Sequence, residues 1–258
     1  FTKREVDVLC PGNLILTVSK GAVNKYNGLI KELVERYGCN EYTEELNPYT
    51  YRNFYNGGGI GIGDLNNDSL PDIFIYGNLV SNKLFINQGD LTFKEEASKY
   101  GLSDPGYSTH ASFFDYDKDG LLDLFLCNVG VYTSDEIGKG GYCIGLQDAF
   151  QGHLKPEERN ELSKLYRNEG DNVFVDVSKD TGLLDQSWTG DAAPLDFDND
   201  GWVDLYVLSM QGHDQLYRNE QGKAFKKVSR DVFPKTPWGA MGIQIFDFDN
   251  DGNQDIYI

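Results

Sequence analysis

Asp115-Tyr-Asp117-Lys-Asp119-Gly-Leu-Leu-Asp123 is one of four copies of an acidic pattern that decides the fold of this 258-residue chain. In each copy, oxygen-bearing side chains occupy positions 1, 3, 5 and 9 of a nine-residue loop. A hard cation takes several oxygen ligands at once, and Ca²⁺ accepts an irregular, carboxylate-rich set more readily than Mg²⁺ does. The pattern therefore favours calcium as a cofactor over four solvated acidic turns without a metal. The candidate ligands are Asp64, Asn66, Asp68 and Asp72 in loop one, Asp115, Asp117, Asp119 and Asp123 in loop two, Asp196, Asp198, Asp200 and Asp204 in loop three, and Asp247, Asp249, Asp251 and Asp255 in loop four.

The first loop departs from the other three. Gly120, Gly201 and Gly252 occupy position 6, where a sharp turn needs a positive φ that glycine adopts easily. Loop one has Ser69 at that position and Asn66 in place of an aspartate. We therefore expect loop one to be the weakest of the four calcium sites.

The residues that follow each loop exclude an EF-hand. That motif needs a bidentate glutamate at position 12 and a helix on each side. Position 12 is instead Ile75, Leu126, Val207 or Ile258. Each loop leads into an apolar or alternating run that is typical of a strand, such as residues 124–127. Each loop is thus predicted to join two strands.

The surroundings of the loops repeat as well. The first aspartates lie at 64, 115, 196 and 247, so the spacings are 51, 81 and 51 residues, with an insertion at about 129–163 in the middle interval. A period near 50 indicates a propeller or a solenoid. A strand rich in small residues precedes each loop, and the segments that follow predict three further strands, which is the content of a propeller blade. The predicted strands are 58–63, 109–114, 190–195 and 241–246 before the loops, and 83–87, 164–168 and 215–219, then 93–97, 174–178 and 225–229, after them.

Asp-x-Asp-x-Asp-Gly-x-x-Asp, followed by a strand and by Leu165-Tyr-Arg-Asn168, resembles the FG-GAP or VCBS repeats of integrin-α-like β-propellers. The resemblance covers about Asn56 to Ile258, and within that group it is closest to the cartilage acidic protein family and its bacterial relatives. Gly152-His-Leu-Lys-Pro156 and Thr236-Pro-Trp-Gly-Ala-Met-Gly242 carry the closer likeness. The family implies a secreted, calcium-binding, non-catalytic propeller used in adhesion or matrix contacts. We therefore expect an extracellular or periplasmic location and a protein or glycan partner.

The predicted fold is an all-β propeller of four-stranded blades at residues 57–258, with a separate N-terminal segment at residues 1–56. Three complete blades and the first half of a fourth can be counted, whereas similar propellers close with about seven, within the general range of about 4–8. We expect the other blades to come from a longer polypeptide, of which this sequence is a fragment, or else from another subunit. In the N-terminal segment, residues 13–18 predict a strand and residues 22–37 an amphipathic helix that caps the propeller.

Charge and cysteine content narrow the partners and the chemistry. A formal net charge of −18 without a basic stripe argues against nucleic acid, and no apolar run approaches the length of a membrane span. Four cysteines allow three pairings, of which the local ones, Cys10–Cys39 and Cys127–Cys143, are favoured. Alternatively, Cys127 is a small buried hydrophobe, because it occupies a strand position that Tyr76 fills in the first repeat.

No catalytic motif is found. The sequence contains no Gly-x-Ser-x-Gly, His-Glu-x-x-His or P-loop, and the densest clusters of acids belong to the metal loops. His110 and Asp191 occupy equivalent positions before loops two and three, where they could meet a ligand at the channel entrance, although a hydrogen-bonded structural histidine is favoured. We predict that the chain is not an enzyme. The alternatives are a carbohydrate-binding module, which Trp188 and Trp238 would serve, and the scaffold of a secreted hydrolase or lyase.

Overall fold

The computed structural model describes residues 58–78, 80–129, 162–185, 189–210, 213–237 and 239–258. These residues form three four-stranded antiparallel sheets and one two-stranded sheet, and the strands of each sheet follow one another in sequence order. The predicted all-β fold and its three and a half blades are confirmed. The strands are β1 Gly59–Gly63, β2 Asp72–Tyr76, β3 Lys83–Asn87 and β4 Phe93–Glu95 in the first sheet, β5 Ser108–Phe114, β6 Asp123–Asn128, β7 Lys164–Asn168 and β8 Phe174–Asp176 in the second, β9 Thr189–Leu195, β10 Asp204–Ser209, β11 Gln215–Asn219 and β12 Phe225–Lys227 in the third, and β13 Gln244–Phe246 and β14 Asp255–Tyr257 in the fourth.

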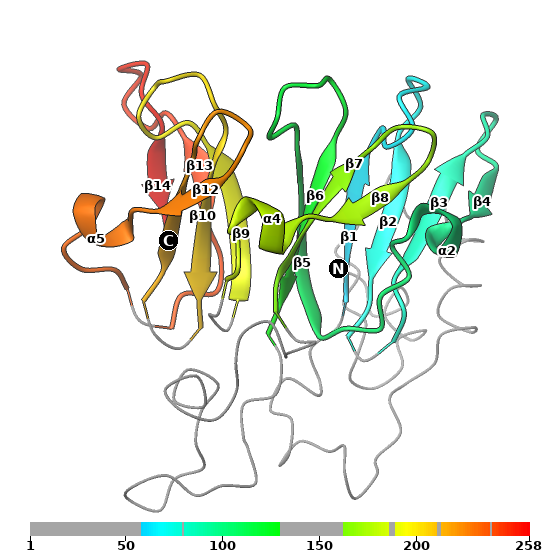
Figure 1. The fold of residues 1–258 in the computed structure, drawn as a ribbon, viewed down its shortest axis with the longest axis horizontal. Helices are drawn as coiled ribbons and strands as arrows, with labels where there is room; N and C mark the ends of the chain where they lie inside the picture. Colours follow the sequence, from blue (N-terminus) through cyan, green and yellow to red (C-terminus); the bar gives the residue numbers. More distant parts are fainter. Residues whose placement is uncertain (1–57, 79, 130–161, 186–188, 211–212, 238) are drawn as a thin grey trace, which may run out of the picture.

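Each acidic loop joins the first strand of a sheet to the second. In Figure 1 the sheets stand side by side, and the four loops project from the same end of the molecule. This arrangement confirms that the loops connect strands, as the sequence predicts. The N-terminal segment at residues 1–56 and most of the insertion at 129–163 lie outside the described residues, so the predictions for them stay predictions.

The hydrophobic core lies between neighbouring sheets. On β6, Leu124 and Leu126 pack with residues of the first sheet, whereas Phe125 and Cys127 pack with residues of the third sheet. All residues of β6 and of β10 are buried. Burial of both faces explains why these strands are nearly continuous apolar runs rather than alternating ones.

The first strands of neighbouring sheets lie close together. The Thr109 hydroxyl on β5 donates to the carbonyl of Thr189 on β9 at 2.7 Å, and the Ser112 hydroxyl donates to that of Ala192 at 2.7 Å. A Cβ atom at Gly61 on β1 would lie 2.5 Å from the ring of Phe113 on β5. A side chain at Gly61 would therefore force the Phe113 ring to shift, in agreement with the small residues predicted on the first strands.

The fourth strand of each complete sheet is shorter than predicted. It ends after three residues, and a single helical turn follows: α2 Ala97–Tyr100, α4 Ser178–Thr181 or α5 Ser229–Val232. The hydroxyl of Ser178 accepts the backbone N–H of Leu165 on β7 at 2.8 Å, and Ser229 accepts that of Leu216 on β11 at 2.8 Å. In the second and third sheets a serine side chain thus takes the place of a backbone carbonyl in the ladder, so the chain can leave the sheet at this point.

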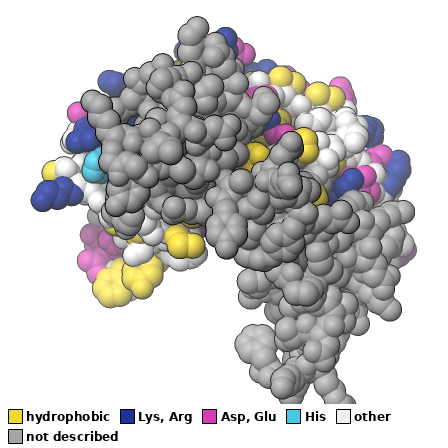
Figure 2. Space-filling model, turned by 90° about the horizontal axis from the view of Figure 1, so that it is seen from below, with side chains coloured by type: hydrophobic (Ala, Val, Ile, Leu, Met, Phe, Trp, Pro, Cys, Tyr) yellow, Lys and Arg dark blue, Asp and Glu magenta, His cyan; other side chains and the backbone are white. Residues whose placement is uncertain are grey.

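Charged side chains of both signs lie on the described part of the surface, and the exclusion of nucleic acid stays a prediction. Figure 2 shows the face opposite the acidic loops, where basic, acidic and hydrophobic side chains of the described residues are interspersed. No helix in the described part of the chain is long and apolar enough to cross a membrane.

Candidate functional site: the acidic loops

The aspartates at positions 1 and 5 shape each loop from within. In loop two, the carboxylate of Asp115 accepts the N–H of Asp119 at 3.2 Å and that of Gly120 at 3.0 Å. Asp119 in turn accepts the N–H of Leu121 at 2.8 Å. Equivalent bonds form in the other three loops. The acidic residues therefore determine the loop conformation and do more than supply ligands.

Two positions in every loop have a left-handed backbone. At position 6, Gly120, Gly201 and Gly252 have φ values of 89°, 85° and 87°, which confirms the prediction of a positive φ. Position 4 was missed by the sequence analysis. It is also left-handed in all four loops, with φ between 56° and 60° at Asn67, Lys118, Asn199 and Asn250. The sequence does contain a signal for this conformation, because asparagine tolerates a positive φ and occupies position 4 in three of the four loops.

Replacing Ser69 by glycine is expected to stabilise the protein. Ser69 has a φ of 69° at the position where the other loops have glycine. A left-handed conformation costs an ordinary residue about 1–2 kcal/mol, and the greater freedom of glycine in the unfolded chain offsets part of the gain. We expect a net increase of about 0.5–1 kcal/mol in the free energy of unfolding, measured by urea denaturation. The reverse change in loop two, Gly120→Ser, should have the opposite sign, and equal signs would contradict the interpretation.

The aspartate at position 9 is a buried anchor. Asp72, Asp123 and Asp204 are each 0% exposed. The carboxylate of Asp123 accepts the N–H of Tyr116, at position 2 of the same loop, at 3.0 Å and the N–H of Asn168, at the end of β7, at 2.9 Å. Asp72 and Asp204 make the same pair of bonds in their own sheets. Position 9 thus fixes the loop to the third strand of its sheet.

The asparagine that ends each third strand was not predicted from the sequence to have a role in the site. Asn87, Asn168 and Asn219 donate their backbone N–H groups to the buried aspartates, and their Nδ2 groups to loop carbonyls. The available signal was the recurrence of asparagine at the end of the repeated third-strand motif.

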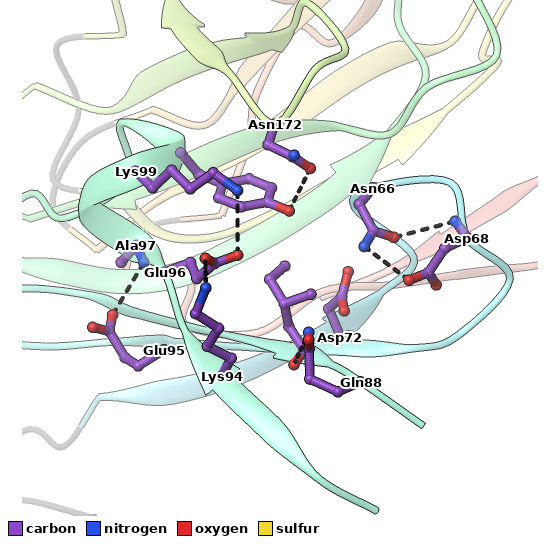
Figure 3. A network of polar contacts seen from close by, with 12 residues as sticks. Asn66, Asp68, Asp72, Gln88, Lys94, Glu95, Glu96, Ala97, Lys99 and Asn172 are labelled. Carbon is purple, nitrogen blue, oxygen red and sulfur yellow. Dashed lines mark hydrogen bonds and ion pairs between the residues drawn. The ribbon is translucent and has the colours of Figure 1, made fainter. Parts of the chain in front are cut away.

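Loop one lacks the carboxylate arrangement of the other loops. The Nδ2 group of Asn66 donates to the carboxylate of Asp68 at 2.9 Å, and the Asn66 carbonyl accepts the Asp68 N–H at 3.1 Å (Figure 3). An amide N–H therefore satisfies an oxygen that would otherwise face a cation. This geometry supports the expectation that loop one is the weakest site.

The other three loops gather carboxylate oxygens. The groups are Asp115, Asp117 and Asp123 in loop two, Asp196, Asp198 and Asp204 in loop three, and Asp247, Asp249 and Asp251 in loop four, and in each group oxygens from the three residues lie within 4.8 Å of one another. Clustered like charges repel, and a purely oxygen donor set is the kind that a hard cation prefers. These residues fit a calcium ion.

Burial raises the pKa of two of these carboxyl groups. The pKa of Asp123 is raised to about 7 and that of Asp204 to about 6, chiefly by burial. The backbone N–H groups that each accepts lower the pKa, while the neighbouring aspartates raise it further. In the absence of a cation, Asp123 thus keeps its proton far above the usual range of an aspartate.

Ionisation of Asp123 should destabilise the metal-free protein. Its carboxyl keeps a proton in the folded state up to about pH 7, whereas its ordinary pKa is 3.8. The folded state therefore binds more protons between these values, so this contribution to stability is lost as pH rises from about 4 to 7. We expect the stability of Asp123→Asn, relative to the parent, to rise over this interval in urea denaturation without calcium. Parallel pH profiles would contradict this expectation.

The other candidate residues have different surroundings. His110 and Asp191 are brought together by β5 and β9, with Nε2 of His110 3.3 Å from a carboxylate oxygen of Asp191. Asp191 also accepts the N–H of Ile243 at 3.1 Å, and the three residues line a hollow of about 340 Å³. This contact agrees with the favoured structural histidine, and a ligand at the hollow stays a prediction. Trp188 and Trp238 lie outside the described residues.

Cys127 is a free thiol and is fully buried between the second and third sheets. Its burial agrees with the interpretation of a small buried hydrophobe, and the predicted Cys127–Cys143 disulfide stays a prediction. Cys143 itself lies outside the described residues, as do Cys10 and Cys39.

Antiparallel four-stranded sheets that pack face to face, each with an acidic loop between its first two strands, define a repeat protein of the β-propeller type. A family model described as FG-GAP-like repeat matches residues 46–126 and 196–258, and the chain belongs to this family.

Curated relatives carry the name cartilage acidic protein 1. The human protein is 24% identical over 72% of this chain and 33% of its own length, and the mouse protein is 23% identical over 71% and 34%. The Xenopus tropicalis protein is 30% identical over 46% of this chain and 19% of its own length. The chain thus spans about a third of the length of the human and mouse relatives.

A solved structure also matches. It is that of an Agrocybe aegerita lectin described as recognising non-reducing terminal N-acetylglucosamine, and it covers 76% of this chain and 59% of its own. The sequence identity is 18% and the TM-score is 0.29, which is too low to support an argument about fold or ligand.

Proposed function

We propose that this chain is a non-catalytic, calcium-binding propeller module that mediates extracellular adhesion or matrix contacts, with a protein or a glycan as its partner. The observation that carries the calcium part is the convergence of three carboxylates within 4.8 Å in each of loops two, three and four. Bound calcium would supply two positive charges where these carboxylates repel one another. The chain's own residues shape the loops and anchor them to the sheets.

The extracellular part of the proposal rests on the family and on the acidic surface. The curated relatives are named for cartilage and for their acidity, and this chain has a formal net charge of −18. A secreted or periplasmic location would supply calcium at the concentrations that sites of modest affinity require. The interacting surface would be presented by a rigid stack of sheets whose connecting loops can vary.

The proposal of a non-catalytic role rests on how the acidic residues are used. The aspartates at positions 1, 5 and 9 of the loops accept backbone N–H groups of the loops and strands. General acid and base catalysis would require carboxyl groups that are free to exchange protons with a substrate. The same argument makes a hydrolase or lyase scaffold the weaker alternative.

Isothermal titration calorimetry with Ca²⁺, followed by binding assays on arrays of matrix proteins and glycans, tests the proposal. We expect the three glycine-containing loops to bind calcium more tightly than loop one. Binding to an arrayed partner is expected with calcium and should be lost in EDTA. A chain with asparagine at positions 1 and 3 of loops two to four serves as the control, and binding to neither array would overturn the adhesion proposal.

A further inference from the structure

Loop two is hydrogen-bonded to the neighbouring sheet through one asparagine side chain. Nδ2 of Asn219, at the end of β11, donates to the carbonyl of Tyr116 in loop two at 2.8 Å. The same Nδ2 group donates to the carbonyl of Val203 in loop three at 2.9 Å. Because Asn219 is buried, this carboxamide bridges the two acidic loops away from solvent.

The same bridge recurs one sheet earlier. Nδ2 of Asn168, at the end of β7, donates to the carbonyl of Leu65 in loop one at 3.0 Å and to that of Leu122 in loop two at 3.2 Å. Both bridges reach position 2 of the preceding loop and position 8 of their own. The repetition indicates a property of the fold rather than an accident of one loop.

The bridge acts on the residues that hold the candidate ligands. Tyr116 lies between the first two aspartates of loop two, and its N–H donates to the buried carboxylate of Asp123 at 3.0 Å. The backbone N–H of Asn219 donates to the buried carboxylate of Asp204 at 2.7 Å. An unbroken series of hydrogen bonds therefore runs from Asp204 through Asn219 and Tyr116 to Asp123.

Two further contacts join loops two and three. The Nζ atom of Lys118 lies 4.2 Å from the centre of the Trp202 ring, so a cation–π contact links position 4 of one loop to position 7 of the next. A Cβ atom at Gly222, in the turn after β11, would lie 2.9 Å from the Cα atom of Asp117. The backbones of the two sheets are therefore in close contact beside the candidate ligands.

We propose that calcium binding at loops two and three is positively coupled and that Asn219 is the positioning residue that transmits the coupling. The inference rests on the proposed calcium function. An ion in loop three orders that loop and thereby fixes the position of Asn219. Asn219 in turn holds the peptide between the first two ligands of loop two, so an ion that binds there next meets a loop that is already ordered. Asn168 couples loops two and one in the same way. Linkage makes the coupling reciprocal.

The test uses chains in which only loops two and three can bind calcium, because the others carry asparagine at positions 1 and 3. Calorimetry compares this two-site chain with chains that retain loop two alone or loop three alone. We expect the second ion to bind about fivefold or more tightly than the single-site chains predict, which is the lower end of typical coupling between sites. In Asn219→Ala the two sites should become independent.

Asn87→Ala is the matched control, because the Asn87 Nδ2 group donates to Pro71 of its own loop at 3.0 Å. The coupling should survive this change. If both single-site chains bind calcium and the two-site isotherm is their simple sum, the coupling is overturned while the calcium function stands. If no chain binds calcium, both fail. If Asn219→Ala does not fold, the comparison of two-site and single-site chains still tests whether the two sites are coupled.

Discussion

Replacement of Asp123 by alanine is expected to lower the free energy of unfolding of the metal-free protein by about 2–6 kcal/mol. The carboxylate is 0% exposed and accepts two backbone N–H groups, those of Tyr116 and Asn168. Alanine leaves both donors buried without a partner, and each such loss costs about 1–3 kcal/mol. The measurement is urea denaturation in EDTA, so that no effect on calcium affinity is included.

Asp255 provides the matched control for this change. It occupies the same position 9 in loop four, but it is exposed and accepts the N–H of Phe248 at 2.8 Å. Because water can replace an exposed acceptor, Asp255→Ala should cost less than about 1 kcal/mol. Asp123→Asn retains one acceptor oxygen and should lie between the two. Equal losses of unfolding free energy at positions 123 and 255 would show that burial of the anchor does not contribute to its effect on stability.

Removal of calcium is expected to lower the melting temperature substantially. A ligand that binds only the folded state at a hundredfold excess over its Kd stabilises it by about 2.7 kcal/mol per site. In a domain of this size, each kcal/mol corresponds to about 2–4 °C, so each filled loop should contribute roughly 5–10 °C. The measurement is a thermal scan by circular dichroism with calcium and with EDTA.

The four loops should contribute unequally to the calcium-dependent shift in melting temperature. Disabling loop two with Asp115→Asn and Asp117→Asn should remove most of one site's contribution, because its carboxylates converge within 4.8 Å. Asp64→Asn in loop one should change the calcium-dependent shift less, since the amide of Asn66 already satisfies an oxygen of Asp68. A melting temperature unchanged by EDTA would disprove the metal role in all four loops.

Much of the fold follows from local patterns in the sequence. The four acidic copies fixed the register of the repeat, and the apolar runs after them indicated the second strands that the structure contains. Position 6 was predicted correctly because glycine signals a positive φ by itself. The helical turns at 97–100, 178–181 and 229–232 were missed. The turns at 178–181 and 229–232 begin with Ser178 and Ser229, whose hydroxyls accept a backbone N–H from the third strand of their sheet, a contact that no local pattern reveals.

The candidate site was predicted only in part. The sequence identified the aspartates, but it gave no reason to separate position 9 from positions 1, 3 and 5. Burial separates them, since Asp123 is enclosed and bound to Asn168, 45 residues away. The role of Asn219 is still less local, because its carboxamide meets the carbonyl of Tyr116, 103 residues away in the chain.

The sequence by itself determined the unit: a strand, an acidic loop and three more strands, repeated in register. These features arise from charge, glycine and strand patterning within a short stretch of chain, so they can be recognised without knowledge of neighbours. Only the tertiary structure decided which aspartates are buried anchors and which loops are joined. The anchors bind the third strand of their own sheet and the bridges between loops join neighbouring sheets, so no short stretch of chain contains both partners of either contact.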